Sequence, residues 1–276
     1  MGEAMIGGLL NKKAIEAGQI VATDPVEKRR REMVTRFGIA ALGNNAEAAT
    51  GAQIIVLCVK PQVLPAVLRE LRGHVERRAL VLSIVAGARA TSIATALGHN
   101  AVVRSMPNTP AQVGEGMTVW TATPKVTETQ REQAQAILRA LGKEIYVEDE
   151  KFLDMATAVS GTGPTYVFLM MEALIDAAVH LGFSRAIARD LVVQTVLGSA
   201  IFSQNSDKHM AELRNMVTSP GGTSAEALYQ LEKGSLRTVF SKAVWAAYQR
   251  SITLGDLASE AMTKEPPRSL DDSSEG

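Results

Sequence analysis

Ile54-Ile55-Val56-Leu57-Cys58-Val59 is an unbroken apolar run, of the kind that forms a strand buried on both faces of a parallel sheet. Lys60-Pro61 ends the run, and the residues from Pro61 to Leu71 follow the pattern of an amphipathic helix. A buried strand followed at once by a helix is the unit from which parallel sheets are built. The run therefore predicts an α/β fold, in which the same unit should recur on either side.

The alternation of strand and helix does extend along the first half of the chain. Strands are expected at 19–23, 79–85, 101–105, 117–121 and 144–147, and helices at 4–17, 25–37, 46–50, 91–97 and 127–141. This order predicts a doubly wound parallel sheet, the Rossmann arrangement. Such a sheet binds its ligand at the carboxyl ends of the strands, where this sequence has short polar or proline-bearing turns.

The start of that pattern lacks its usual first strand. A dinucleotide-binding Rossmann fold opens with a strand that leads into a Gly-x-Gly-x-x-Gly turn, whereas this sequence begins at Met1-Gly2 with its first helical pattern. Without this strand, the neighbouring strands at 19–23 and 54–59 lack a ladder partner. Each buried N–H or C=O group left unpaired would cost about 1–3 kcal/mol of folding free energy. We expect about ten further residues upstream, forming an apolar strand and a Gly-x-Gly turn.

The pattern changes after residue 150. Strand signals stop, and helices are expected at 151–159, 164–181, 184–202, 207–217, 225–233 and from 236 to about 261. The helix at 164–181 is apolar on most of its faces, which in a small helical domain favours a subunit interface. We therefore expect a dinucleotide-binding Rossmann domain at 1–150, an all-α domain for substrate binding and dimerisation at 151–263, and a disordered tail at 264–276.

Composition narrows the class of function. The 276 residues carry 29 Lys+Arg and 29 Asp+Glu, so the net charge is zero and no nucleic-acid partner is indicated. Cys58 is the only cysteine, which excludes an internal disulfide, as in a reducing cytoplasm, and we expect it to be a small core residue. The four histidines show no spacing for a metal site.

No uninterrupted apolar run approaches the about 20 residues of a membrane helix. The richest candidate, from Tyr166 to Leu181, contains Glu172, Asp176 and His180. The sequence thus predicts a cytoplasmic protein without a metal, nucleic-acid or membrane partner.

A second stretch, Thr218-Ser219-Pro220-Gly221-Gly222-Thr223-Ser224, indicates an anion site. Two glycines let the backbone turn, and the helix expected at 225–233 would present its unpaired N–H groups to an anion. Thr223 with Glu226 three residues later is a capping-box pattern, which predicts that Thr223 caps the helix and that the hydroxyls of Ser219 and Ser224 are free. Taken alone, a capped helix after a Pro-Gly turn explains these residues equally well.

The residues after the first expected strand give two competing signals for a nucleotide. Asp24 stands where a carboxylate would hold a ribose 2′-hydroxyl, whereas Lys28, Arg29 and Arg30 would favour a 2′-phosphate. The sequence therefore leaves NAD and NADP open at this position.

Four ordered stretches, spread over both halves of the chain, resemble the pyrroline-5-carboxylate reductase family. They are Val59-Lys60-Pro61; Met106-Pro107-Asn108-Thr109-Pro110 followed by Gly114-Glu115-Gly116; Ser160-Gly161-Thr162-Gly163-Pro164 followed by Tyr166; and Thr218 to Ser224. The resemblance implies reduction of 1-pyrroline-5-carboxylate to L-proline, the last step of proline biosynthesis, with NADPH, or alternatively NADH, as the donor. It also implies a homodimer that interlocks through the C-terminal helices, or a higher oligomer of such dimers.

The resemblance also implies site residues. For the cofactor they are Met1 and Gly2 at the pyrophosphate, Asn45, Cys58, Val59, Lys60 and Pro61 on the adenosine side, and Ile84, Val85, Ala86, Gly87 and Asn108 near the nicotinamide. For the substrate they are Ser219, Gly221, Gly222, Thr223 and Ser224, with Ser224 as the catalytic residue where the family more commonly has threonine.

Two alternative functions stay open at this point. A non-catalytic dinucleotide-binding regulator would also have these nucleotide-binding loops. Another NADP-linked reductase of similar layout would need a lysine as proton donor early in the helical domain, and Lys151 is the only lysine near that position.

Overall fold

The computed structural model describes residues 1–263; the tail expected at 264–276 lies outside the described residues. The chain forms two compact units. Unit 1 is Met1–Gly161 together with the chain from Ala247 on, and unit 2 is Thr162–Ala246. This division differs from the one expected at residue 150, because the helix that follows residue 150 packs on the sheet of unit 1 and the second part of the last helix also belongs to that unit.

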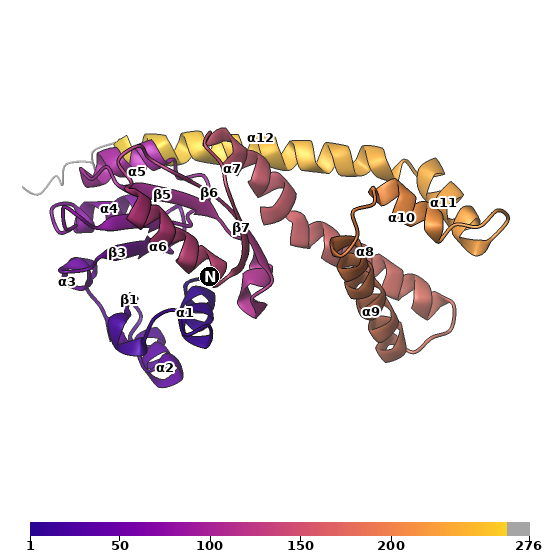
Figure 1. The fold of residues 1–276 in the computed structure, drawn as a ribbon, viewed down its shortest axis with the longest axis horizontal. Coiled ribbons are helices and arrows are strands. Elements are labelled where there is room, and N and C mark those ends of the chain that lie inside the picture. The colour runs from indigo at the N-terminus through magenta and orange to yellow at the C-terminus, as the bar shows by residue number, and fades with distance from the viewer. Residues whose placement is uncertain (264–276) are drawn as a thin grey trace, which may run out of the picture. The chain divides into compact units, whose positions relative to one another are not determined.

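Unit 1 alternates strands and helices, as the sequence predicts (Figure 1). The strands are β1 (Val21–Thr23), β2 (Ala40–Leu42), β3 (Ile54–Leu57), β4 (Leu80–Ser83), β5 (Val102–Met106), β6 (Gly116–Ala122) and β7 (Gly142–Tyr146). The helices are α1 (Gly2–Asn11), η1 (Ala17–Gln19), α2 (Glu27–Phe37), α3 (Asn45–Ala49), α4 (Leu64–Leu71), α5 (Ala90–Leu97), η2 (Thr109–Val113), α6 (Glu128–Arg139), α7 (Lys151–Ala156) and the π-helical turn η3 (Thr157–Gly161). The sequence pattern missed β2, because alanine gives little strand signal.

The strands form two separate sheets. β1 pairs in parallel with β2, and the other five pair in the order β3-β4-β5-β6-β7. β1 and β3 are therefore each hydrogen-bonded along one edge only, and these are the two strands for which the sequence predicts a missing ladder partner. The open edge has a consequence for burial: β3 is largely half-buried, whereas its neighbour β4 is buried throughout.

The larger sheet is mixed rather than wholly parallel. β3, β4 and β5 run in parallel, but β6 is antiparallel to β5, and β7 is parallel to β6. The reason is the connection from β5 to β6, which contains only the short helix η2. A parallel neighbour needs a crossover of about a dozen residues or more, so the short connection returns the chain in the opposite direction.

Two apolar clusters cover the two faces of this sheet. Leu80 and Leu82 of β4 point to a cluster that includes Met5 of α1 and Leu138 of α6. Val81, between them, points to the opposite cluster, which contains residues of α4 and α5. Successive strand residues face opposite sides, so a run buried at every position needs helices on both faces. The doubly wound fold predicted from the sequence is confirmed.

Unit 2 is entirely helical in its described residues. It contains α8 (Gly163–His180), α9 (Arg185–Gln204), α10 (Met210–Met216), α11 (Thr223–Lys233) and the first part of α12 (Leu236–Thr263). Helix α8 has no buried residue although it is strongly apolar. One described helix, α9, is long and apolar enough by length and composition to span a membrane, with 11% of the window buried. The sequence analysis had instead favoured Tyr166 to Leu181 as the richest candidate.

Candidate active site

The residues expected to hold a nucleotide all lie at strand ends or helix starts of unit 1. Gly2 opens α1, Asn45 opens α3, residues 58–61 form the turn between β3 and α4, residues 84–87 follow β4, and Asn108 follows β5. Apart from Met1 and Gly2, which lie at the start of α1, the expected set therefore lies at the carboxyl ends of parallel strands. This is the edge at which a doubly wound sheet binds its ligand.

The turn after β1 is organised by its own side chains. The Oδ1 atom of Asp24 accepts a hydrogen bond from the Val26 N–H at 2.8 Å, and the Arg30 guanidinium donates to the carbonyl oxygens of Asp24 (2.8 Å) and Pro25 (3.0 Å). Arg29 forms an ion pair with Glu3. Asp24 and two of the three expected cations thus have roles within the protein, while Lys28 stays exposed on α2.

Asn45 is fixed by neighbours on both sides. Its Oδ1 accepts from the Thr23 hydroxyl at 2.7 Å, and its Nδ2 donates to Glu70 at 2.6 Å. The adjacent Asn44 caps α3 by accepting from the N–H groups of Ala46 and Glu47. An asparagine just before an apolar helical stretch is the signal that could have identified it.

Cys58 is exposed, so the prediction that it is a core residue is wrong. It follows β3, the strand with an open edge, and lies beside Gly2, where an added Cβ would be 3.5 Å from the Cys58 Cβ. Although solvent reaches the residue, desolvation of the sulfur raises the pKa of its thiol to about 11. At neutral pH the sulfur is therefore a protonated thiol and not a nucleophile.

Asn108 acts as a brace between two segments. Its Oδ1 accepts from the Met117 N–H at 2.9 Å, and its Nδ2 donates to the Ser160 carbonyl oxygen at 3.1 Å. Ser160 lies in η3, and π-helical turns within helices are frequent at functional sites. The residue thus ties the end of β5 to the turn that carries the Ser160-Gly161 motif. A sequence pattern cannot show this contact, because its partners are 9 and 52 positions away.

Lys151 does not have the surroundings of a proton donor. Its Nζ atom is 2.7 Å from the Asp149 Oδ2 atom, and the hydrogen bond that it donates to Asp149 raises the pKa of the lysine. A catalytic lysine needs the opposite shift, toward neutral pH, to exchange its proton readily.

In unit 2, the loop at 219–224 leads directly into α11. Gly221 adopts a left-handed backbone conformation, with φ +70°, which favours glycine over other residues. The Gly222 N–H donates to the Ser219 carbonyl oxygen at 3.1 Å, which closes the turn. The chain then enters the helix at Thr223, two residues earlier than the sequence pattern indicates.

Thr223 is not the helix cap, contrary to the capping-box prediction. The N-cap is Gly222, whose extended backbone (φ −84°, ψ 169°) places it just outside the helix, and the helix start has no side-chain hydrogen bond. Thr223 is the first helical residue, from which a side chain does not reach back to cap. An uncapped helix start leaves its first N–H groups available to an anion.

The hydroxyls of Ser219, Thr223 and Ser224 are exposed, and among the described residues none of them has a hydrogen-bond partner. Thr218, by contrast, donates its hydroxyl to the Arg214 carbonyl oxygen at 2.8 Å. Three unpaired hydroxyls therefore surround an uncapped helix start. In the described part of the chain, no group of three His, Cys, Asp or Glu residues is arranged to hold a metal ion.

These features define a two-part protein, a Rossmann unit and a helical unit that contains an uncapped helix start. Residues 1–87 match the family model described as NADP oxidoreductase, coenzyme F420-dependent, and residues 150–254 match that for pyrroline-5-carboxylate reductase dimerisation. The pyrroline-5-carboxylate reductase of Synechocystis is 41% identical over 255 residues, which cover 92% of this chain and 95% of the relative.

Two solved structures agree with this match. The Plasmodium falciparum pyrroline carboxylate reductase with NADP bound has a TM-score of 0.84 at 34% identity and covers 92% of this chain and 94% of its own. The Coxiella burnetii pyrroline-5-carboxylate reductase has a TM-score of 0.85 at 36% identity, with the same coverage. The chain belongs to the pyrroline-5-carboxylate reductase family, as its four motif stretches predicted.

Proposed function

We propose that this protein reduces 1-pyrroline-5-carboxylate to L-proline, the last step of proline biosynthesis, with NADPH as hydride donor and NADH as the alternative donor. The observation that carries the proposal is the uncapped start of α11 with its three unpaired hydroxyls, in a chain that also has a Rossmann unit and belongs to this family. We place the reaction in the cytoplasm.

The residues of unit 1 fit a dinucleotide. Helix α1 opens at Gly2 without a side-chain cap, so its first N–H groups can bind the pyrophosphate. Asn45 and residues 58–61 would border the adenosine, and residues 84–87 with Asn108 the nicotinamide. Lys28 is the cation best placed by its exposure to meet a 2′-phosphate, because Arg29 and Arg30 are already engaged. The bound cofactor supplies the hydride that is added to C5 of the imine.

The residues of unit 2 hold the other reactant. The N–H groups at the start of α11 and the hydroxyls of Ser219 and Thr223 bind the substrate carboxylate. Ser224 hydrogen-bonds the ring nitrogen, or orders the water molecule that does so, which makes C5 more electrophilic. The reaction adds one hydride to C5 and one proton to nitrogen, so positioning supplies most of the rate enhancement. The substrate, as the protonated imine, brings this proton with it, so no histidine or carboxylate acid is needed.

A second copy of the chain completes the protein. We propose a homodimer through α8 and α9, with a higher oligomer of dimers built on it. Both helices lie within the residues that match the family's dimerisation model. The apolar surface of α9 is then a protein interface, which accounts for its membrane-like composition.

The test is a turnover assay with purified protein, measuring proline formed from 1-pyrroline-5-carboxylate with NADPH and, in parallel, with NADH. We expect proline with NADPH. A folded sample that forms no proline with either donor would overturn the proposal and favour a non-catalytic role.

Ser224→Ala is the sharper variant. It should lower kcat about 100-fold without lowering Tm, because its hydroxyl has no partner in the described chain. Ser235→Ala, at an exposed serine between α11 and α12, is unsuitable as its control because Ser235 has a positive φ. Thr95→Ala is the better control, since Thr95 is exposed on α5 of unit 1 and its hydroxyl bonds only the Thr91 carbonyl oxygen of the same helix.

A further inference from the structure

We propose that one face of α12, formed by Ser251, Gly255 and Ser259, positions the β4–α5 loop (residues 84–89) for hydride transfer, and that Gly255 sets the distance. The proposal rests on the proposed function, because it takes this loop to border the nicotinamide. All of these residues belong to unit 1. The three positions are four residues apart and so lie on one face of the helix.

The backbones of α12 and the loop approach each other through two glycines. An added Cβ at Gly87 would lie 3.1 Å from the Gly255 nitrogen and 3.2 Å from the Leu254 carbonyl carbon. An added Cβ at Gly255 would lie 3.2 Å from the Gly87 carbonyl oxygen. These distances are shorter than ordinary van der Waals contact, so a side chain at either glycine would require the opposing backbone to move by a few tenths of an ångström.

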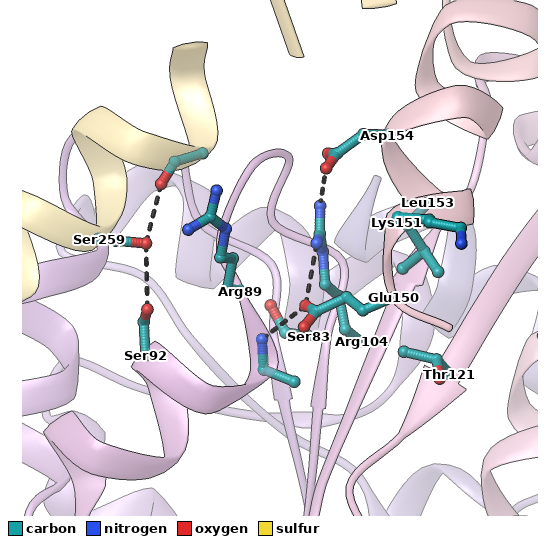
Figure 2. A network of polar contacts seen from close by, with 12 residues as sticks. Ser83, Arg89, Ser92, Arg104, Thr121, Glu150, Lys151, Leu153, Asp154 and Ser259 are labelled. Atoms are coloured by element: carbon teal, nitrogen blue, oxygen red, sulfur yellow. Dashed lines mark hydrogen bonds and ion pairs between the residues drawn. The ribbon is translucent and has the colours of Figure 1, made fainter. Parts of the chain in front are cut away.

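Polar contacts flank the two glycines along α12. One turn after Gly255, the hydroxyls of Ser259 and Ser92 are 3.0 Å apart, as Figure 2 shows. One turn before it, the Ser251 hydroxyl donates to the Asp154 Oδ1 atom at 3.0 Å. Ser251 is 4% exposed, so this bond is made in the interior. The contact between Gly87 and Gly255 therefore lies between two hydrogen bonds of α12, those of Ser251 and Ser259.

A buried ion cluster fixes the end of the loop, where α5 begins. Arg104 on β5 is 3% exposed, and its guanidinium contacts Glu150 at 2.9 Å and Asp154 at 3.1 Å (Figure 2). Glu150 also accepts from the Ala90 N–H at 2.8 Å, which supplies the cap that α5 lacks from its own sequence. A carboxylate at a helix start is favourable in addition because of the helix dipole.

The loop is thus held at both ends, and at Gly87 its backbone lies close to the backbone of α12. Its start is fixed too, because the Val85 N–H donates to the Ser83 hydroxyl at 3.2 Å. A side chain at Gly255 has to displace Gly87 or α12, since the Gly87 carbonyl is backbone and cannot rotate away. A 1 Å misplacement can cost about 100-fold in the rate of hydride transfer, so a shift of a few tenths of an ångström should already lower kcat measurably.

The sequence carried a signal for this position. An isolated glycine within a long helical pattern is unfavourable for the helix, and such a residue usually has a packing or functional reason. Gly255 lies inside the 28-residue helix α12 and is buried.

The experiment compares Gly255→Ala and Gly255→Val with Thr253→Ala and Thr253→Val in the full chain. Thr253 is exposed on the same helix, and its hydroxyl bonds only the Gln249 carbonyl oxygen. We expect Gly255→Ala to lower kcat about 3- to 10-fold and Gly255→Val about 100-fold. The KM for 1-pyrroline-5-carboxylate should change by less than about twofold, since the substrate loop lies in unit 2. Both Thr253 variants should match the unaltered protein.

Melting temperature separates positioning from packing. Alanine favours a helix over glycine, so Gly255→Ala should not lower Tm, and a loss of kcat at unchanged Tm supports positioning. A Gly255→Val protein that is folded and turns over normally would overturn the proposal. So would a loss of activity in Gly255→Ala that merely follows the unfolded fraction.

Cofactor binding keeps the two proposals distinguishable. NADPH affinity, measured by the quenching of tryptophan fluorescence, should weaken about tenfold in Gly255→Val and stay unchanged in Thr253→Val. If the unaltered protein binds NADPH but forms no proline, the proposed function is wrong. The difference in NADPH affinity between Gly255→Val and Thr253→Val then still tests whether Gly255 positions the loop. If it does not bind NADPH, both proposals are overturned.

Discussion

The two units of this chain contain similar apolar sequences but bury them to very different extents. Leu64, Leu80 and Leu82 of unit 1 are each 0% exposed, and both apolar clusters found in the described chain are built mainly from this unit. In α8 of unit 2, Phe168 and Leu169 are 63% and 65% exposed. Unit 1 therefore has a core of its own, whereas many apolar residues of α8 stay exposed in the described part of the chain.

This difference teaches that apolar composition alone does not show where a core lies. The strand run of unit 1 and helix α8 are both rich in apolar residues, but helices of the same chain cover the first on both faces. An exposed apolar surface of this extent marks an interaction site. Because α8 lies within the residues that match the dimerisation model, a second copy of the chain is the partner we propose.

The largest effect is expected from a charge on α8. Met171→Asp should abolish turnover and unfold unit 2, because an aspartate in an apolar interface would be desolvated without a partner. Circular dichroism, with sedimentation to measure mass, checks this result. If the units depend on assembly, Tm of the unaltered protein should also rise with protein concentration.

Val34→Asp is the matched control in unit 1. Val34 is an exposed apolar residue on α2, and aspartate has a similar helix propensity, so the free energy of unfolding should change by less than about 0.5 kcal/mol. A folded, monomeric Met171→Asp protein would contradict the comparison, since unit 2 would then be stable alone.

The next effect concerns truncation of one leucine in each unit. Leu82→Ala removes a fully buried side chain and should lower the free energy of unfolding by about 2–5 kcal/mol. Leu169→Ala, at an exposed position of α8, should instead raise the dimer dissociation constant and leave unit 1 unaffected. Denaturant titrations at two protein concentrations distinguish these effects. If both variants lost the same free energy of unfolding at both protein concentrations, the apolar residues of α8 would be buried within one chain, like those of unit 1, and the comparison would be wrong.

Much of unit 1 could be predicted from sequence because its signals are local. The continuous apolar runs at 54–59 and 79–85 have the pattern of strands buried on both faces, and glycines mark where helices end. Gly38 and Gly98 do end α2 and α5 with left-handed conformations. The four motif stretches then indicated the family. The role of the helical half in dimerisation was indicated by the apolar residues on most faces of α8.

The remaining features depend on contacts that sequence spacing does not encode. Cys58 has the pattern of a core residue but is exposed, because β3 is paired along one edge only. The antiparallel direction of β6 follows from the length of a connection and not from the strand's residues. Gly87 and Gly255 are 168 positions apart in the sequence, so their contact could not be predicted from sequence spacing.

The smallest effect tests a cap in unit 1 against a capping pattern in unit 2. Thr127 and Thr223 each precede a glutamine or glutamate by three residues, which is the spacing of a capping box. Only the first exists: the Thr127 hydroxyl accepts from the Gln130 N–H, and the Gln130 side chain accepts from the Thr127 N–H. In α11 the glycine before Thr223 takes the cap position, and Thr223 becomes the first helical residue with an unpaired hydroxyl.

Thr127→Ala should therefore lower the free energy of unfolding by about 0.5–2 kcal/mol, because it leaves an N–H group of α6 without its acceptor. Thr223→Ala should leave that free energy unchanged or slightly raised, since alanine is the better helix former and no bond is lost. Its effect should appear instead as a higher KM for 1-pyrroline-5-carboxylate, through the loss of one hydroxyl at the proposed carboxylate site. Urea denaturation and steady-state kinetics on the same preparations measure both quantities. If Thr223→Ala destabilised the protein as much as Thr127→Ala while KM stayed constant, Thr223 would be a structural cap after all, and the start of α11 would no longer be free to bind an anion.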